Sequence, residues 1–514
     1  ESCDPGVCVP GSGCLACHPG EAKCNGQNSE ICNAEGTGWD VVPCDPVQGV
    51  MCDPNNGQCY GACSPAELGL SYIGCEYYPT VTNNVAENLG GFHFAVAVAN
   101  ASGKTANIRI DKGAQIIVQD TVAAGAVKVI NLPWDNQLLG TMLSSSMVVP
   151  DGAFRLRTDQ PVTVYQYNPV EYTNGFSFTY TNDASLLLPV NTWTGDYWVV
   201  SRNMWNYFGS PYPGIYAVTA SQDNTKVTLS PSATGKLVRP GGGVAADGTG
   251  VITLNQGDVL QVIGSTNNPN AAPDPNDLTG THVTADKPIQ VIGGHYCTFV
   301  PYNIGYCDHL EESIPPYETL AKDIIVTPPL IPTGGNTPKA QMVRIVATEP
   351  NTTLTYDPPQ PGAPTMIANA GDYVELAQTS ANFRITSNNK IVVAQYMLGQ
   401  DAGGDSGDPA MVYAVPIEQY RDQYLFHAPI NYEKNYVNIV APTGASVTLD
   451  GNAVGNFTPI GGSGYGVARV VLPNNVDGNH EISANAKIGI SVYGYGQYTS
   501  YWYPGGLDLK ILPQ

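Results

Sequence analysis

Apolar and polar residues alternate along much of the chain beyond residue 75, and this alternation predicts β-strands. Four segments align without gaps and carry the pattern most clearly: FRLRTDQPVTVYQ (154–166), THVTADKPIQVIG (281–293), FRITSNNKIVVAQ (383–395) and HEISANAKIGISV (480–492). Each has apolar residues at every second position on both sides of an Asp or Asn that is followed, two residues later, by Pro or Lys. Because such a side chain can bond its own downstream backbone and form a turn, we expect two consecutive strands in each segment.

The repetition extends upstream of each segment. A strand, a polar turn and a second strand come first, as in AVANASGKTANIRI (97–110), followed by a Gly-led strand, as in AGAVKVINL (124–132). The copies begin roughly 100 to 130 residues apart, which suits one β-sandwich each, and no stretch keeps a helical period. The sequence therefore predicts an all-β protein, a tandem array of about four β-sandwich domains preceded by a small disulfide-rich module. The predicted boundaries are 1–75 for the module and 76–190, 191–316, 317–416 and 417–514 for the repeats.

The connectors between the repeats are also similar to one another. Each connector has a proline (Pro189, Pro316 or Pro416) followed four positions later by an aromatic residue or Leu. A segment rich in strand-forming residues comes next. We therefore expect each domain to meet its neighbour in the same way, which would give a stiff array.

Cysteine usage indicates an oxidising compartment. Of the 13 cysteines, all but two lie in the first 75 residues, which are rich in Gly, Pro, Asn and Asp and too poor in apolar residues to fold without disulfides. These are Cys3, Cys8, Cys14, Cys17, Cys24, Cys32, Cys44, Cys52, Cys59, Cys63 and Cys75. Cys297 and Cys307 are predicted to pair with each other. The odd number in the module leaves one cysteine that is a free thiol, bonded to another chain, or paired with a group outside this sequence.

The net charge argues against two classes of binding partner. A formal net charge of -22 argues against nucleic acid and against anionic membrane surfaces, since binding either depends on Lys and Arg. No apolar run is long enough to span a bilayer. The first residues, ESCDPGVC, lack the basic and apolar regions of a signal peptide, so a secreted protein would be numbered here from after its removed signal. We expect a secreted, extracellular or cell-surface location.

Two short motifs suggest cofactors. Residues 14–18 read CLACH, the haem-attachment pattern, with Cys14 and Cys17 as thioether positions and His18 as axial ligand. Apolar surroundings and a second ligand are not evident nearby, and the motif reads equally well as a turn between two half-cystines, so no haem is expected.

Calcium is the more plausible cofactor. The loop GQDAGGDSGDPA (399–410) holds Asp401, Asp405 and Asp408 among glycines, and hard cations favour such carboxylate-rich loops. A solvated acidic loop with an Asp-Pro turn explains the same residues. Apart from these motifs, the seven histidines are scattered without catalytic or metal spacing, so no enzyme is expected.

The last feature of the composition that bears on function is the high tyrosine content, with 30 Tyr against 10 Phe. Tyr packs an apolar ring and still offers a hydroxyl to a partner, although it is also a common residue at half-buried strand positions. Both faces of the C-terminal strand region are aromatic, so one face would be uncovered in an isolated sandwich. The predicted contact surface consists of Tyr493, Tyr495, Tyr498, Tyr501, Trp502 and Tyr503.

A family resemblance emerges from these pieces together. The run CSPAELGLSYIGCEYYPTVT (63–82), the paired strands around Asx-x-Pro/Lys, and connectors such as DASLLLPV and DPAMVYAVPIEQY resemble the IgG-Fc-binding-protein N-terminal domain family. The Cys-rich leader resembles its bacterial branch, which occurs in secreted or surface-exposed proteins of myxobacteria. The resemblance implies a surface location and brings no catalytic residues with it.

Two functions from different classes follow from this sequence. The first is a non-catalytic extracellular cell-surface protein that acts in adhesion or binding through a stiff β-sandwich array, with surface proteins or glycans as partners. The alternative is a structural subunit that polymerises with copies of itself into an extracellular fibre or coat, with the connector contacts reused between chains. An enzyme and a single-haem protein are the remote alternatives.

Overall fold

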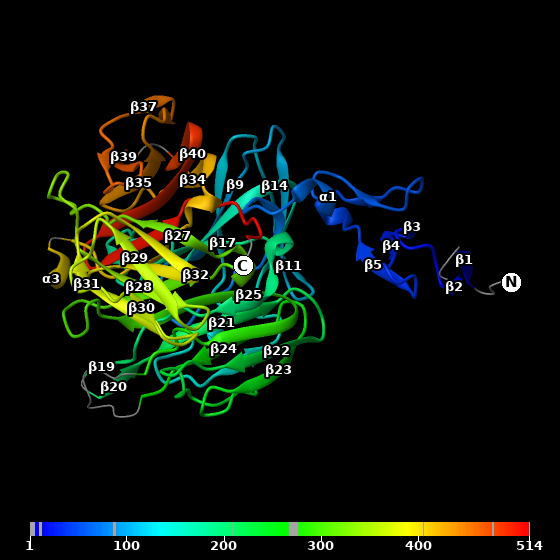
Figure 1. The fold of residues 1–514 in the computed structure, drawn as a ribbon, viewed down its shortest axis with the longest axis horizontal. Helices are drawn as coiled ribbons and strands as arrows, with labels where there is room; N and C mark the ends of the chain where they lie inside the picture. Colours follow the sequence, from blue (N-terminus) through cyan, green and yellow to red (C-terminus); the bar gives the residue numbers. More distant parts are fainter. Residues whose placement is uncertain are drawn as a thin grey trace.

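The computed structural model describes residues 6–9, 13–85, 89–207, 209–266, 276–404, 406–474 and 477–512. It confirms the predicted fold class, because β-strands make up nearly all of its regular structure (Figure 1). The α-helices of the described residues are single turns: α1 (Pro65–Leu68), α2 (Asn136–Leu139) and α3 (Gln400–Gly403). No helix in this part of the chain is long and apolar enough to cross a membrane.

Each repeat is a β-sandwich built on the same strand plan. The strands of the first are β8 (Gly74–Tyr77), β9 (Phe94–Ala99), β10 (Ala106–Lys112), β11 (Gln115–Val122), β12 (Val127–Leu132), β14 (Arg155–Tyr167) and β17 (Ala184–Leu187). The first half of β14 pairs with β8 and β10, and its second half pairs with β9 and β17. One long strand therefore belongs to both layers of the sandwich.

The other repeats follow this order. The second contains β18 (Thr194–Trp198), β21 (Gly214–Ala220), β22 (Thr225–Ser230), β23 (Gly250–Leu254), β24 (Val259–Ile263), β25 (His282–Thr298) and β26 (Asp308–Ser313). The third contains β27 (Ala321–Val326), β28 (Gln341–Ala347), β29 (Thr352–Asp357), β30 (Met366–Ile367), β31 (Tyr373–Thr379), β32 (Phe383–Met397) and β33 (Met411–Tyr413). The fourth contains β34 (Arg421–His427), β35 (Lys434–Pro442), β36 (Val447–Leu449), β37 (Asn452–Val454), β38 (Thr458–Pro459), β39 (Tyr465–Leu472), β40 (Asn479–Gly496) and β41 (Thr499–Pro504). Strand β13 (Met147–Val149), from the first repeat's segment, pairs with β24 of the second.

The expected turn inside the four aligned segments is wrong. Each segment lies within one continuous long strand, β14, β25, β32 or β40. The Asx side chain does not turn its own backbone but accepts a hydrogen bond from a backbone N–H at the start of the neighbouring strand. The N–O distances are 2.7 Å for Asn107 to Asp159, 2.8 Å for Lys226 to Asp286, 2.7 Å for Thr353 to Asn388 and 2.9 Å for Ser446 to Asn485. The Asx position therefore fastens two strands of one sandwich together.

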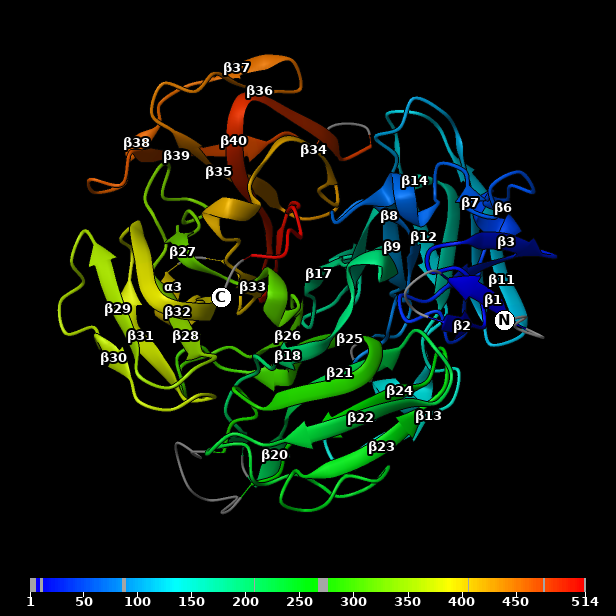
Figure 2. The same ribbon diagram turned by 45° about the vertical axis from the view of Figure 1, so that its right-hand side comes forward.

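The four repeats are arranged as a closed ring (Figure 2). Their last strands, β17, β26, β33 and β41, which we call the closing strands, lie at the centre and contact one another in ring order. The fourth repeat thus packs on the first, where the hydroxyls of Tyr165 and Tyr167 donate to the carbonyls of Leu425 (3.1 Å) and His427 (2.8 Å). The fourth repeat therefore returns to the first, so that the predicted array of four repeats closes on itself.

The chain segment that follows the first strand of a repeat lies in the interface between that repeat and the next. Residues 78–85 are fully buried between the first and second repeats without forming a strand. The side chain of Gln166 replaces a neighbouring strand there, because it accepts from the Thr80 N–H at 2.8 Å and donates to the Thr80 carbonyl at 2.9 Å. Gln395, at the equivalent position of the third repeat, accepts from the Thr327 N–H at 2.9 Å. The same Gln-to-backbone contact therefore recurs in the first and third repeats, although other side chains in the interfaces differ.

The interface between the second and third repeats shows that difference. Its centre is the buried guanidinium of Arg344, which lies 2.8 Å from a carboxylate oxygen of Asp277 and 3.0 Å from one of Glu375. Arg202 binds the same Glu375 carboxylate at 2.7 Å. These two cations hold the pKa of Glu375 at about 2, against the effect of its burial.

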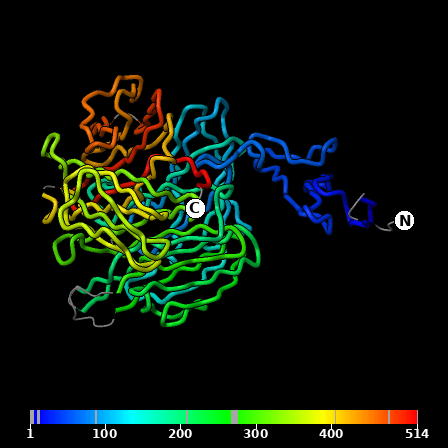
Figure 3. Tube along the Cα trace, viewed as in Figure 1, coloured from blue at the N-terminus to red at the C-terminus, as the bar shows by residue number. Residues whose placement is uncertain are grey.

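The N-terminal module projects from the ring (Figures 1 and 3). Its strands are β1 (Val7–Val9), β2 (Gly13–Leu15), β3 (Ala22–Asn25), β4 (Asn28–Cys32), β5 (Trp39–Pro43), β6 (Met51–Cys52) and β7 (Cys59–Tyr60). Disulfides link Cys17 to Cys32, Cys24 to Cys52, Cys44 to Cys59, and Cys63 to Cys75. Cys14 is also disulfide-bonded, Cys8 lies exposed on β1, and Cys3 lies outside the described residues.

At the end of the ring nearest this module, the chain ties its own connectors together. The one-turn helices η3 (Val190–Thr192), η4 (Tyr317–Thr319) and η5 (Ile417–Gln419) directly follow the three predicted proline anchors. Residues 505–512 cross them: the Asp508 N–H donates to the Gln419 carbonyl at 2.8 Å and the Leu512 N–H to the Glu318 carbonyl at 3.0 Å. The repeats are thereby held together at this end as well.

Candidate interaction surface and the polar core beneath it

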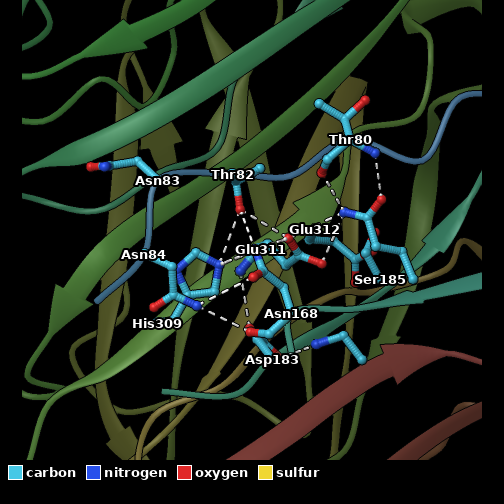
Figure 4. A network of polar contacts seen from close by, with 12 residues as sticks. Thr80, Thr82, Asn83, Asn84, Asn168, Asp183, Ser185, His309, Glu311 and Glu312 are labelled. Carbon is cyan, nitrogen blue, oxygen red and sulfur yellow. Dashed lines mark hydrogen bonds and ion pairs between the residues drawn. The ribbon is translucent and has the colours of Figure 1, made fainter. Parts of the chain in front are cut away.

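A buried polar core occupies the centre of the ring (Figure 4). Its most connected member is Asp183, which directly precedes β17 and is 0% exposed. The carboxylate accepts one backbone N–H from each of the four closing strands: Ala184 at 2.9 Å, Glu311 at 3.1 Å, Met411 at 3.2 Å and Trp502 at 3.2 Å. A single side chain therefore binds all four repeats.

Further carboxylates surround Asp183. Asp308 accepts from the Thr499 hydroxyl at 2.9 Å, and Glu312 accepts from the Ser185 hydroxyl at 3.2 Å. Burial raises the pKa of Asp183, Asp308 and Glu312 well above the ordinary values, and the amide hydrogen bonds to each act in the opposite direction. These groups are closed off from solvent, so the core positions strands and does not meet ligands.

Four loops meet at the ring end away from the N-terminal module. They join each long strand to its closing strand, and we call them the axial loops; α3, in the third, marks this end in Figure 1. The Asp401 N–H of the third loop donates to the Gly305 carbonyl of the second at 2.9 Å. The ring of Tyr498, from the fourth, lies 5.0 Å from that of Tyr306 and 6.1 Å from that of Tyr180 of the first. Residues far apart in the sequence therefore form one continuous surface.

The axial loops leave large apolar side chains uncovered. Phe176 is fully exposed, and four further large apolar or aromatic side chains of the first two axial loops are between 40% and 49% exposed. We call this set the loop-end patch: Phe176, Phe178, Tyr180, Ile304, Tyr306 and the partly exposed Tyr498. The hairpin of β15 (Thr173–Asn174) and β16 (Ser177–Phe178) carries its most exposed member, Phe176. The disulfide between Cys297 and Cys307 closes the second axial loop.

An acidic hollow adjoins the loop-end patch. It has a volume of ≈ 530 Å³ and is lined by Gln400, Asp401, Ser406, Glu433 and Gln497. The lining residues come from the third axial loop, the start of β35 and the fourth axial loop. Every one of them is polar, so the hollow and the patch differ sharply in chemistry while sharing an edge at Asp401 and Tyr306.

The predicted C-terminal contact surface is wrong for all but one of its residues. Tyr493, Tyr495, Tyr501, Trp502 and Tyr503 are each 0% exposed. The third repeat covers one face, where the Tyr495 hydroxyl donates to the Leu330 carbonyl at 2.8 Å, and the first repeat covers the other, where the Tyr503 ring lies 4.9 Å from that of Tyr165. The prediction treated the fourth sandwich as isolated, whereas ring closure buries both faces.

The two cofactor motifs are placed as follows. Asp401 is exposed, Asp408 is buried and accepts from the Gln400 N–H at 3.0 Å, and Asp405 lies outside the described residues. Across the part of the chain that is described, no group of three His, Cys, Asp or Glu side chains could hold a metal ion, and calcium stays a prediction. In the CLACH motif, Cys14 and Cys17 are both disulfide-bonded and His18 is exposed, so neither sulfur is a thiol that could attach haem.

The loop-end patch was not predicted from the sequence. Its signal is the stretch EYTNGFSFTYTND (171–183), where aromatic residues occur without strand alternation between a long strand and its connector. Aromatic residues in a polar, Gly-containing loop are better candidates for exposure than aromatic residues in an alternating strand.

Comparison with known proteins agrees with the resemblance seen in the sequence. The family model described as IgGFc binding protein matches residues 183–494, which span the second to fourth repeats. The IgGFc-binding protein of Homo sapiens is 27% identical over 274 residues, which cover 51% of this chain and 5% of the human protein. The chain thus corresponds to a small part of that relative. Because the family model matches more than half of its residues, the chain belongs to the IgGFc-binding protein family.

Proposed function

We propose that the protein is a non-catalytic extracellular binding protein that acts in adhesion, and that the loop-end patch contacts its partner. The observation that carries this proposal is the convergence of axial loops from all four repeats into one surface with uncovered aromatic side chains. Contiguous exposed apolar side chains on a soluble protein usually mark a contact site. Loops held by a rigid scaffold are the usual carriers of such sites.

The covalent and electrostatic features support an extracellular setting. Disulfides of this density persist in oxidising compartments. The net charge of -22 favours partners other than nucleic acid and anionic membranes. We propose surface proteins or glycans as the partner class; the name of the human relative assigns immunoglobulin Fc to that protein, and Fc is therefore a reasonable probe.

The ring favours this function over self-assembly into a fibre. A fibre that reuses the repeat-to-repeat contacts needs a free face at each end of the array. In the closed ring those faces meet each other, as the hydrogen bond from Tyr167 to His427 shows. Self-assembly would have to use other surfaces, such as the loop-end patch or the N-terminal module.

The test compares two double variants of the full chain. Phe176→Ser with Tyr306→Ser removes two exposed side chains of the patch, and Val251→Ser with Met366→Ser removes two exposed apolar side chains elsewhere on the ring. Beads coated with each protein are washed over immobilised immunoglobulin Fc, mucin-type glycoprotein and the wild-type chain itself. We expect the wild type and the control to be retained on Fc or on the glycoprotein and the patch variant to be lost from that surface, whereas retention on the wild-type chain alone would favour self-assembly. Retention on none of them, or equal retention of both variants, would contradict the proposal.

A further inference from the structure

We propose that the groove beside β39 in the fourth repeat binds an extended segment of a protein partner. The segment would add a strand to the outer edge of that sheet, and it would carry aliphatic side chains and a carboxylate. The groove has a volume of ≈ 500 Å³ and lies between β39 and the hairpin of β36 and β37, with Leu330 and Asn336 of the third repeat also lining it. It shares no residue with the loop-end patch, so this inference goes beyond the proposed function.

The outer edge of β39 is open over most of its length. β35 covers the inner edge of the whole strand, whereas β38 covers the outer edge only at Gly466 and Val467. No strand in the described part of the chain lies beside residues 468–472 on that side. This stretch reads ARVVL, is largely aliphatic and contains no proline, and its Val471 is 58% exposed. Such an edge can accept a further strand.

The backbone groups that a partner would meet can be identified. The N–H of Ile460, directly after β38, donates to the Tyr465 carbonyl at 2.9 Å, so the backbone of Tyr465 faces the outer edge. The register of β39 with β35 is unbroken, and successive residues of a strand direct their N–H and C=O groups to alternate sides. The N–H and C=O groups of Arg469 and Val471 therefore also face outward, beyond the part of the edge that β38 covers.

The second repeat shows how the protein fills such an edge. β24 holds the place of β39 there, and the first repeat donates β13 to its outer edge, where Met147–Val149 run antiparallel to Val259–Gln261 (Figure 2). The other side of β13 packs on the backbone of Gly241 and Gly242. A Cβ atom on Gly242 would lie 2.7 Å from the Met147 carbonyl carbon. A short aliphatic segment from outside the sandwich thus binds between a sheet edge and a second wall.

The groove of the fourth repeat has two such walls, and the described chain places no strand between them. Leu449 and Val467 line it with apolar side chains that are 7% and 1% exposed, and Val454 of β37 is partly exposed on the wall opposite β39. The hollow beside β31 of the third repeat, lined by residues 360–364, has a volume of only ≈ 280 Å³. The fourth repeat therefore offers the larger site for an added strand.

Arg469 gives the groove a preference for a carboxylate. Its side chain lines the groove and forms no ion pair with the residues that the structure describes. Nε donates to the Pro328 carbonyl at 2.9 Å and a terminal nitrogen donates to the Asn382 side-chain oxygen, and both acceptors are neutral. Burial lowers the pKa of Arg469. A carboxylate on the incoming segment would form a charge-assisted hydrogen bond with this guanidinium.

The experiment selects peptides without assuming their sequence. A phage library of random dodecapeptides is panned on the full chain, and phage that also bind the Val471→Pro variant are removed. Proline lacks the N–H that an added strand would use, and it is tolerated on an edge strand where that N–H points away from the sheet. The matched control is Val471→Ala, which keeps the N–H. Selected peptides should bind Val471→Ala nearly as well as the wild type and Val471→Pro about 10- to 100-fold more weakly.

Synthetic peptides then test the binding mode on the wild-type protein, where the folding of a variant plays no part. Two N-methylated versions of each peptide carry their methyl groups on alternate residues. Only one set of N–H groups in an added strand faces β39, so one version should bind about 10- to 100-fold more weakly and the other should keep its affinity. Replacing the peptide's carboxylate residue by the matching amide should weaken binding about 10-fold.

Each outcome decides one part of the inference. Equal affinity of the two methylated versions would overturn strand addition, and unchanged affinity after loss of the carboxylate would overturn the role of Arg469. If the library yields no peptide that separates the wild type from Val471→Pro, the inference fails as a whole. The Phe176→Ser/Tyr306→Ser variant should bind the peptides as the wild type does. A loss of binding by that variant would show that they occupy the loop-end patch instead.

Discussion

Substitution of Asp183 by asparagine should destabilise the whole ring, because this carboxylate accepts one N–H from each closing strand. Ala184 and Trp502 donate to one oxygen, and Glu311 and Met411 donate to the other. Asparagine keeps the shape of the side chain but can offer only one oxygen. Whichever way its amide is turned, an NH2 group faces two N–H donors that had an acceptor before.

The magnitude follows from those two lost bonds. A buried donor left without an acceptor costs about 1–3 kcal/mol, so the pair costs about 2–6 kcal/mol. Part of this loss of stability is offset, because the neutral Asn side chain carries no desolvation penalty. The desolvation of the charged carboxylate is also what raises the pKa of Asp183. We expect Asp183→Asn to lower the free energy of unfolding by about 2–4 kcal/mol.

The assay is urea unfolding of the full chain, combined with hydrogen exchange of peptides that contain Met411 and Trp502. Asp422→Asn is the control, since its partner Lys487 lies 3.1 Å away on the surface and such pairs contribute less than about 1 kcal/mol. In the Asp183→Asn protein, exchange should accelerate in the third and fourth repeats as well as the first. Unfolding and exchange indistinguishable from the control would refute the assignment of Asp183 as the tie between the repeats.

Three further predictions concern pH, ring closure and the loop end. Burial raises the pKa of Asp408 to about 6 from an ordinary 3.8, so the folded protein keeps a proton that the unfolded chain releases. Stability should therefore fall by about 2.4 kcal/mol from this group as pH rises from 4 to 7, and pH-dependent unfolding of Asp408→Asn should lack that part of the fall. Tyr167→Phe removes the hydroxyl that bonds the His427 carbonyl at 2.8 Å across the closure, and should cost about 1–2 kcal/mol in urea unfolding; an unchanged midpoint would count against this contact. Cys297→Ser/Cys307→Ser opens the 10-residue link in the second axial loop, and thermal unfolding should show a loss of about 2–3 kcal/mol together with weaker bead retention. Wild-type retention by this variant would show that the disulfide does not shape the patch.

The strands and repeats could be read from the sequence because they depend on local periodicity. Alternating apolar residues define the two faces of each strand, and four aligned copies make the pattern unmistakable. The connectors were also visible, since a proline fixes the chain before each one-turn helix. These signals lie within short windows of the chain.

The role of the Asx residues could not be read in the same way. Asp159 favours a local turn by propensity, yet its carboxylate binds the N–H of Asn107, which is far away in the sequence. A continuous long strand in two layers of a sandwich gives the same apolar alternation as two separate strands. The tertiary partner decides between them.

Ring closure was missed for a related reason. The aromatic run at the C-terminal end has two apolar faces, and the sequence shows this without showing what covers them. Tyr503 is covered by Tyr165 of the first repeat and Tyr495 by Leu330 of the third. Contacts between residues so far apart leave no periodic signal, and the same is true of the axial loops that gather into the loop-end patch.

Small-angle X-ray scattering of the full chain tests most directly whether the four repeats form a closed ring. A closed ring with a projecting module should give a radius of gyration of about 25–28 Å, close to that of a compact chain of this length. Four sandwiches joined in an open row should give a value above about 40 Å. A value in the higher range, or a scattering curve of separate flexible domains, would contradict the ring and the shared role of Asp183 at its centre.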